Sequence, residues 1–245
     1  MSERIAPTLL VLDMDRTLIN SDWAVQIYGQ ACKQEGLDIR DQLRNAQTAA
    51  EQTAGSFAAR SDIEKRADVT PDLMTRVDTT FKELCRQYDH RDMLVFPETE
   101  MFLHRAGRLA IPHVILTQGD DPQWQQLKLE AAGLARIPHV IAGLNDESGA
   151  RITKGGIIAS WTESTTGVVA PVGAEPTLSG PQLRARHAVL VDDKGSSFID
   201  LPADHDAYWI QRGMLRPSQQ IPAGSEHMAQ VITSLLQIDI ESYAA

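Results

Sequence analysis

The sequence predicts an α/β protein with a mostly parallel, doubly wound sheet and an inserted all-helical unit. Short apolar runs alternate with amphipathic stretches over most of the chain, which is the pattern of strands and helices in a parallel sheet. The alternation stops after residue 19, and helical spacing alone continues to about residue 92. We therefore predict an α/β core of residues 1–19 and 93–245 that carries a helical insertion of residues 20–92.

The predicted strands are short apolar runs. The first covers residues 8–12 and is partly β-branched, which is typical of a strand buried on both faces. The other predicted strands are residues 113–117, 139–142, 187–191 and 207–211.

The predicted helices are marked by capping residues. Asp121 caps a helix with Pro122 at its first position, and Gly133 ends that helix. The segment 162–181 is rich in Gly, Pro, Ser and Thr and is predicted to be a long surface loop. The helices are expected at residues 21–33, with Ser21 or Asp22 as the cap, and at residues 39–54, 72–87, 97–108, 122–132 and 226–237.

The composition limits the class of protein. A hydrophobic share of 42% argues against global disorder, and a net charge of −10 argues against binding to nucleic acid or to an anionic membrane. The first residues resemble neither a secretory signal nor a membrane span. Cys32 and Cys85 lie in predicted helices, so we expect buried free thiols and a cytoplasmic protein. The composition predicts no oligomeric state.

Polar and charged residues stand where the predicted strands end. Because the carboxyl ends of parallel strands share one edge of the sheet, we expect their side chains to meet there. These residues are Asp13 and Asp15 after the first strand, Thr117, Gln118 and Gly119 after the second, Lys154 in a later segment, and Asp192 and Asp193 after residues 187–191.

This set of side chains indicates a metal site that also binds phosphate. Several carboxylates cannot remain ionised together without a cation, because like charges raise each other's pKa. Mg²⁺ binds carboxylate oxygens and substrate phosphate. Thr117, Lys154 and backbone amides such as that of Gly119 are suited to the phosphoryl oxygens, where transition-state charge accumulates.

The same residues resemble the haloacid dehalogenase-like hydrolase superfamily over about residues 9–213. The first motif of the family matches residues 13–18, the second Thr117, the third Lys154, and the acidic fourth motif Asp192 with Asp193. The segment 118–134, with Gln126 and Lys128, is also similar to members that have a helical cap. The resemblance implies a flavodoxin-like or Rossmann-like core, a mobile cap over the site, and phosphoryl transfer through an aspartyl-phosphate.

Residue roles follow from that resemblance. Asp13 is expected to attack phosphorus, and Asp15 to protonate the leaving group and then deprotonate water. The expected Mg²⁺ ligands are the Asp13 carboxylate, the Asp15 backbone carbonyl and Asp193, with Asp192 in an outer or water-mediated position. Thr117, Gln118, Gly119 and Lys154 are expected to bind phosphate. The predicted function is a Mg²⁺-dependent phosphatase that acts on a small phosphorylated metabolite.

Two residues depart from the family pattern. Arg16 stands where the first motif commonly has glycine, and Ser197 stands where the fourth motif often has another acid. These departures leave open a catalytically weak binding or regulatory protein that retains the fold. A sugar phosphomutase of the same architecture is the other alternative. A dehalogenase fits less well, because that chemistry needs neither a metal nor the acid at Asp15.

Overall fold

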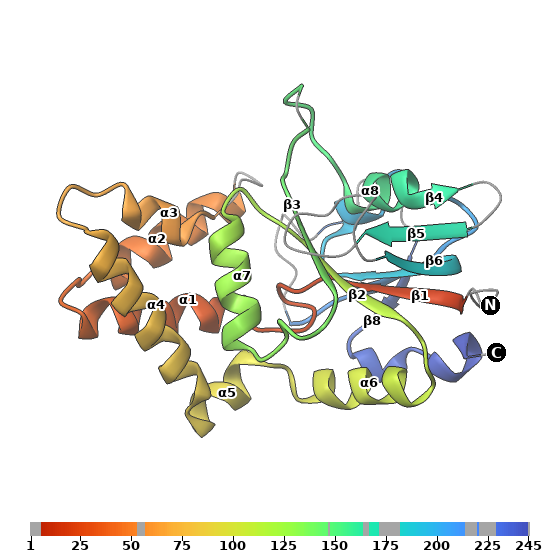
Figure 1. Ribbon diagram of the computed structural model, residues 1–245, viewed down its shortest axis with the longest axis horizontal. Helices are drawn as coiled ribbons and strands as arrows, with labels where there is room; N and C mark the ends of the chain where they lie inside the picture. The colour runs from red at the N-terminus through yellow and green to blue at the C-terminus, as the bar shows by residue number, and fades with distance from the viewer. Residues whose placement is uncertain are drawn as a thin grey trace.

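The structure is a computed structural model that describes residues 6–52, 57–146, 148–163, 167–171, 182–213, 220 and 229–244. These residues form an α/β core with helices inserted after the first strand, as predicted (Figure 1). Among them, no helix has the length and apolar character that a membrane span requires.

One eight-stranded sheet forms the core of the described chain. Its strands are β1 (Ala6–Leu12), β2 (His113–Gln118), β3 (His139–Ala142), β4 (Thr162–Glu163), β5 (Gly167–Pro171), β6 (Gln182–Asp192), β7 (Asp206–Ile210) and β8 (Gln230–Ile232). Strands β3, β2, β1 and β6 lie side by side and run parallel. On the other side of β6, its C-terminal half pairs with β7, which pairs in turn with β8, and its N-terminal half pairs with the antiparallel β4–β5 hairpin.

Helices fill the segments between the strands. Those between β1 and β2 are α1 (Ser21–Gln34), α2 (Arg40–Gln52), α3 (Ala59–Glu64), α4 (Pro71–Arg86), α5 (Tyr88–Leu94) and α6 (Pro97–Arg108). We call α1 to α5 the helical insertion. Two further helices are α7 (Pro122–Ala131) and α8 (Lys154–Trp161), and short 3₁₀ turns cover Gly195–Phe198, Leu235–Gln237 and Ile240–Tyr243.

Both faces of the sheet are buried, which confirms the doubly wound core. Alternate side chains of a strand point to opposite faces. Leu10 of β1 belongs to one buried cluster together with Phe102 of α6, whereas the adjacent Leu9 belongs to a second cluster together with Trp161 of α8. Figure 1 shows α6 and α8 on opposite sides of the sheet.

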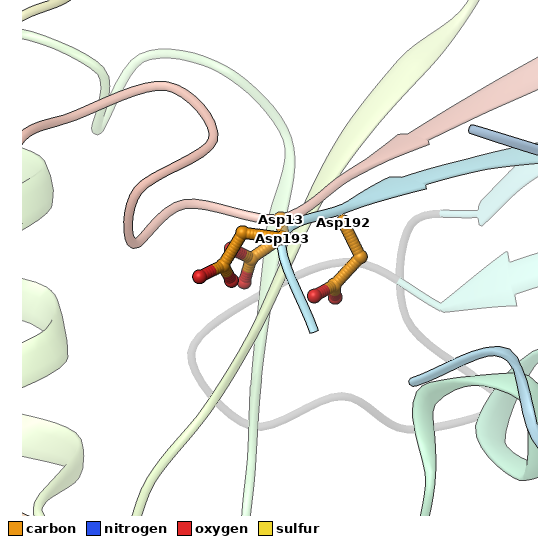
Figure 2. Close-up of side chains that lie close together, drawn as sticks. All are labelled: Asp13, Asp192 and Asp193. Atoms are coloured by element: carbon orange, nitrogen blue, oxygen red, sulfur yellow. The ribbon is translucent and has the colours of Figure 1, made fainter. Parts of the chain in front are cut away.

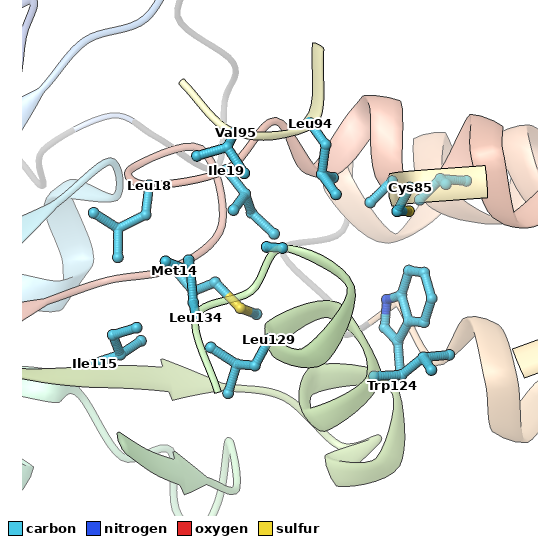
Figure 3. Close-up of a cluster of buried hydrophobic side chains, with 14 of the residues drawn as sticks. Met14, Leu18, Ile19, Cys85, Leu94, Val95, Ile115, Trp124, Leu129 and Leu134 are labelled. Atoms are coloured by element: carbon cyan, nitrogen blue, oxygen red, sulfur yellow. The ribbon is translucent and has the colours of Figure 1, made fainter. Parts of the chain in front are cut away.

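The two connections to the helical insertion lie against each other. Ile19 and Val95 form an isolated antiparallel bridge, and the Asn20 N–H donates to the Leu94 carbonyl at 2.7 Å. Ile19, Leu94 and Val95 are grouped in Figure 3. The chain therefore leaves and re-enters the core at one paired position.

Helix α7 joins the core to the helical insertion. Trp124 is buried, with its ring centroid 4.8 Å from that of Tyr28 and 5.6 Å from that of Phe81. Asp121 caps α7 by accepting from the Trp124 N–H at 2.9 Å, as predicted, and its second oxygen accepts from the Ser61 N–H of α3 at 2.8 Å. Aromatic packing and this shared carboxylate hold the insertion against α7.

Three local predictions require correction. The cap of α1 is Asn20, whose side chain accepts from the Trp23 N–H, rather than Ser21 or Asp22. Within the predicted helix 226–237, residues 226–228 lie outside the described residues, and Gln230–Ile232 is strand β8, which satisfies backbone groups along the edge of β7. Within the predicted loop 162–181, the structure forms β4 and β5, while residues 164–166 and 172–181 lie outside the described residues.

Candidate active site

The loop after β1 begins at Asp13 and turns sharply. The Asp13 N–H donates to the Val191 carbonyl of β6 at 2.9 Å, which holds Asp13 at the edge of the sheet. The Met14 carbonyl then accepts from the N–H groups of both Leu18 and Ile19, at 3.0 and 3.1 Å. These bonds fold the motif back on itself and bring residues 14–17 beside the carboxyl ends of the strands.

Arg16 lies at the tip of this turn in a left-handed backbone conformation, with φ of 61°. A side chain other than glycine in this region costs of order 1–3 kcal/mol, which accounts physically for the glycine that the family commonly has there. The Arg16 guanidinium donates to Asp22 at 2.9 Å, and Gln47 donates to the same oxygen at 2.7 Å. Arg16 therefore links the motif loop to α1 and α2.

Three buried carboxylates converge at the ends of β1 and β6. Ligand oxygens of Asp13, Asp192 and Asp193 all lie within 4.8 Å of one another (Figure 2). Burial, together with Asp192 and Asp193, raises the pKa of Asp13 to about 8 against the opposing effect of Lys154. The second carboxylate oxygen of Asp13 is buried and accepts no hydrogen bond from the described residues.

Lys154 lies between two of these acids. It is the first residue of α8, which Thr153 caps by accepting from the Gly156 N–H at 2.9 Å. The Lys154 ammonium donates to Asp13 and, at 2.6 Å, to Asp192. Burial by itself would lower the pKa of Lys154, but the two carboxylates outweigh it and raise that pKa above its usual value.

The start of α8 packs tightly against the turn that follows the Gly195–Phe198 segment. A Cβ atom on Gly155 would lie 2.2 Å from the Ile199 carbonyl oxygen and 2.6 Å from the Leu201 nitrogen, so this position requires glycine. The Thr153 hydroxyl also donates to the Ile199 carbonyl at 2.8 Å. These contacts fix the position from which Lys154 reaches the acids.

Lys128, named above only as part of a segment similar to members with a helical cap, also lies at the site. It lies on α7, is only 3% exposed, and donates to both Asp15 oxygens at 2.5 and 2.6 Å. Burial by itself would raise the pKa of Asp15, but Lys128 outweighs it and lowers that pKa below its usual value. The available signal was the spacing of Gln125 and Lys128, which places them on one face of a helix.

Thr117 and Gly119 lie next to Gln125 at the end of β2. The Thr117 hydroxyl donates to the Gln125 side-chain oxygen at 3.2 Å. The Gly119 N–H donates to the Ala142 carbonyl at 3.0 Å, so in this arrangement that amide is used in pairing with β3. A Cβ atom on Gly119 would lie 2.5 Å from the Gln125 side-chain nitrogen, which explains the glycine.

The Gln118 side chain binds two backbone carbonyls at the end of β2. Its side-chain nitrogen donates to the carbonyls of Gly143 and Ile152, at 3.2 Å each. In this arrangement the amide holds the 143–152 segment against the end of β2. Gln118 also borders the cavity described below, so a role in phosphate binding stays a prediction.

Asp192 and Asp193 are held by their neighbours. Asp192 accepts from the Lys194 N–H at 2.7 Å, in addition to its bond with Lys154. The Trp209 indole N–H donates to the Asp193 carbonyl at 3.0 Å. Ser197, at the position where the fourth motif often has an acid, is buried in the Gly195–Phe198 turn.

A cavity of about 130 Å³ adjoins the site. The sheet edge contributes Asp15 and Asp193 to its lining, and α7 contributes Lys128. The helical insertion contributes Val25 of α1 and Phe57 of the loop before α3. The cavity therefore lies between the core and the insertion, where a small molecule can reach Asp15.

The acidic cluster fits a hard divalent cation. Its donors are all carboxylate oxygens, which Mg²⁺ prefers, and one oxygen of Asp13 is buried and accepts no hydrogen bond from the described residues. Asp13, Asp192 and Asp193 are the residues that could hold the ion. The Asp15 carboxylate is outside this cluster and is bound to Lys128, so the predicted metal contact of Asp15 through its backbone carbonyl stays a prediction.

Comparisons with known proteins show the fold. No protein-family model matches the chain, and no curated protein matches it. A protein from Burkholderia xenovorans described as a haloacid dehalogenase-like hydrolase is 18% identical, with a TM-score of 0.58 over 96% of this chain and 98% of that one. CbbY from Rhodobacter sphaeroides, in complex with xylulose-1,5-bisphosphate, is 15% identical, with a TM-score of 0.53 over 96% and 97%.

A further solved structure has the same arrangement. YfnB from Bacillus subtilis, described as a HAD hydrolase bound to magnesium, is 13% identical, with a TM-score of 0.50 over 95% of this chain and 96% of that one. Each match covers the helical insertion as well as the sheet, since almost the whole chain is aligned. The chain therefore has the fold of the haloacid dehalogenase-like hydrolases, with its helical insertion placed after β1.

Proposed function

We propose that this chain is a Mg²⁺-dependent phosphoric monoester hydrolase that acts on a small phosphorylated metabolite through an aspartyl-phosphate. The observation that carries the proposal is the position of Asp13. Its buried carboxylate lies beside Asp192, Asp193 and the Lys154 ammonium, and Asp15 lies at the adjoining cavity. A nucleophile, a cation site and an acid are thus available at one edge of the sheet.

In the first step, an Asp13 oxygen attacks phosphorus and the bond from phosphorus to the ester oxygen breaks. Asp15 donates a proton to that oxygen, so the leaving group departs as an alcohol. Lys154, beside Asp13, offsets the repulsion between the anionic nucleophile and the anionic substrate. Bound Mg²⁺, held by Asp13 and Asp193 with Asp192 nearby, would supply further neutralisation of charge on the phosphoryl oxygens.

In the second step, water attacks the phosphorus of the aspartyl-phosphate. Asp15 accepts a proton from that water, phosphate is released, and the Asp13 carboxylate is regenerated. The ion pair with Lys128 holds Asp15 as a carboxylate, which is the form that accepts a proton in this step. The first step needs the protonated form, so Asp15 must take up a proton before the leaving group departs. Thr117, Gln118, Gly119 and Lys154 remain our candidates for binding the phosphoryl oxygens; in this arrangement the N–H of Gly119 donates to the Ala142 carbonyl.

Two of the structural neighbours support the proposal in general terms. YfnB was crystallised with magnesium, and CbbY with a phosphorylated sugar. These ligands belong to those proteins. They support a Mg²⁺ ion and a phosphate ester as the first ligands to test with this chain.

The test is hydrolysis of acetyl phosphate and p-nitrophenyl phosphate by the purified chain with Mg²⁺. We expect turnover that Asp13→Asn abolishes and that Asp72→Asn, which changes an exposed acid at the start of α4, leaves unchanged. Radiolabelled acetyl phosphate should label the wild-type chain on a carboxylate. Turnover that persists in Asp13→Asn would refute the nucleophile, and no turnover in the wild type would favour a binding protein that retains the fold.

Asp15→Asn separates chemistry from metal binding. We expect this variant to bind Mg²⁺ with nearly unchanged affinity and to turn over about 10²–10⁴-fold more slowly, the usual effect of removing a positioned acid or base. A small loss of rate would mean that another group acts as the acid. Product analysis with a sugar phosphate then distinguishes free phosphate from a transferred phosphoryl group, which a phosphomutase would give.

A further inference from the structure

The cavity beside Asp15 has a cationic lining, although the whole chain has a net charge of −10. Such a local reversal of sign concentrates anionic ligands at the site. The charged side chains that line the cavity are the cations Arg16, Lys128, Arg151 and Lys194 and the anions Asp15 and Asp193.

Three of these charges are accounted for by the proposed reaction centre. Lys128 is paired with Asp15 through two short hydrogen bonds. Asp193 belongs to the acidic cluster that could hold the metal ion. The remaining cations come from separate segments that meet only at the cavity, namely Arg16 in the loop after β1, Arg151 before α8, and Lys194 after β6.

Arg16 is the best-placed of the three. Its side chain is 14% exposed, and its guanidinium donates to Asp22, which in turn accepts from Gln47 of the helical insertion. This fixes a cation where the core meets the insertion. The backbone at Arg16 has φ of 61°, so glycine would occupy the position without strain, yet the chain has arginine there. The ion pair with Asp22 holds the guanidinium in place at the lining of the cavity in spite of this backbone strain.

We propose that the leaving group of the substrate carries a second anionic group, a carboxylate or a second phosphate, and that Arg16 binds it together with Arg151 and Lys194. This deepens the proposed function and rests on it. The phosphoryl group would lie at Asp13, and the cavity beyond Asp15 would receive the leaving group. A guanidinium binds either anion through paired N–H donors, and Arg16 presents one at the lining of the cavity that also holds Asp15.

Matched substrates test this directly. Phosphoglycolate and 2-hydroxyethyl phosphate differ in a carboxylate against a neutral hydroxymethyl group, and propane-1,3-diol bisphosphate and 3-hydroxypropyl phosphate differ in a second phosphate. We expect kcat/KM to favour the member with the second anion in at least one pair, by roughly ten- to hundred-fold, the range for a charged hydrogen bond. The substrate pair with the larger ratio of kcat/KM shows whether the second anion is a carboxylate or a phosphate.

Arg16→Met and Arg16→Gly locate the effect. In both variants the preference should fall to within about three-fold of unity, whereas Arg108→Met, which removes an exposed cation of α6, should keep it. Arg16→Gly removes the backbone strain at this position, so we expect the variant to stay folded. A thermal unfolding midpoint close to that of the wild type would then show that the lost preference reflects lost binding and not lost folding. The inference is overturned if the preference for the substrate with the second anion survives in both Arg16 variants. It is also overturned if the wild type is active on acetyl phosphate but shows no such preference in either matched pair.

Binding measurements separate this inference from the proposed function. Calorimetry with Asp13→Asn and the two matched pairs reports the preference without turnover. If the wild type has no phosphatase activity but the anionic members still bind more tightly through Arg16, the proposed reaction fails and the anion site stands. If neither pair shows a difference in affinity, the anion site is refuted whatever the enzyme's activity.

Discussion

Lys154 and Lys128 are both 3% exposed and both bind carboxylates, yet their surroundings have opposite effects. The Lys154 ammonium lies between Asp13 and Asp192, which raise its pKa above the usual value in spite of burial. Lys128 donates to Asp15, and burial lowers its pKa because Asp15, with a smaller effect of Asp13, does not outweigh desolvation. Around Lys154 three acids face one ammonium, whereas around Lys128 the charges balance.

This difference indicates where a divalent cation can bind. Burial is the main cause of the raised pKa of Asp13, and the neighbouring acids Asp192 and Asp193 raise it further against the opposing effect of Lys154, so the region of Lys154 has more acids than cations. The region of Lys128 has no excess for a cation to neutralise. Our proposal places the metal in the first region and proton transfer in the second, and the predictions below test this separation.

The largest expected effect is on stability in Lys154→Met. Removing this ammonium leaves buried carboxylates without a counter-charge, which typically costs about 3–5 kcal/mol. Urea unfolding without divalent ions measures the loss. Asp192→Asn in the same chain should restore part of it, and Lys65→Met, which changes an exposed lysine, should alter stability by less than about 0.5 kcal/mol. A urea midpoint of Lys154→Met equal to that of the wild type would show that the buried acids do not depend on the Lys154 charge.

The second effect is stabilisation by Mg²⁺. A ligand that binds only the folded state stabilises it by about 2.7 kcal/mol at a concentration 100 times its Kd. Asp193→Ala should weaken the metal affinity and reduce this gain, because it removes an acid of the cluster. Lys128→Met should keep most of the gain, since Lys128 donates to Asp15 rather than to an acid of the cluster. Equal losses in the two variants would show that the two regions are not separate.

The two lysines also show how far the sequence predicts the site. Asp13, Thr117, Lys154 and the Asp192–Asp193 pair follow or lie between buried strands, and the parallel sheet brings such positions to one edge whatever the details of the loops. Lys128 lies inside a helix. Its burial depends on Asp15, which is 113 residues away in the sequence. The spacing of residues within the helix therefore does not show whether this lysine is buried or exposed.

The fold shows the same limit. The buried strands and the cap Asp121 were predictable because apolar runs and capping residues are local features. Strands β4 and β8 have only two and three residues, and β5 begins with glycine and ends with proline, so none of them shows a pattern long enough to predict a strand. β5 and β8 become strands by pairing with β6 and β7.

The third expected effect is the loss of the Lys128–Asp15 pair in Lys128→Met. We expect a cost of about 2 kcal/mol, because Asp15 loses its partner but its side chain is 24% exposed and can be hydrated from the cavity. Asp15→Asn in the same chain should recover much of this stability, and the double-mutant cycle measures the coupling. Additive losses would mean that the two side chains do not interact in solution.

Lys128→Met also tests the position of Asp15 through the leaving group. An alkyl phosphate needs a proton on its departing oxygen, whereas acetyl phosphate and p-nitrophenyl phosphate have good leaving groups that need it less. If Lys128 acts through Asp15, kcat should fall more for the alkyl ester than for the other two substrates. An equal fall for all three would assign Lys128 a structural role only.

The smallest effect concerns the helix cap that positions Lys154. Thr153→Ala removes the hydroxyl that caps α8, and Thr70→Ala removes the corresponding cap of α4 in the insertion; each should cost about 1 kcal/mol. Only Thr153 adjoins Lys154, so only Thr153→Ala should lower turnover, and Thr153→Ser should retain it. If both alanine variants lower turnover equally, the cap contributes general stability, and the position of Lys154 depends instead on its two carboxylate partners.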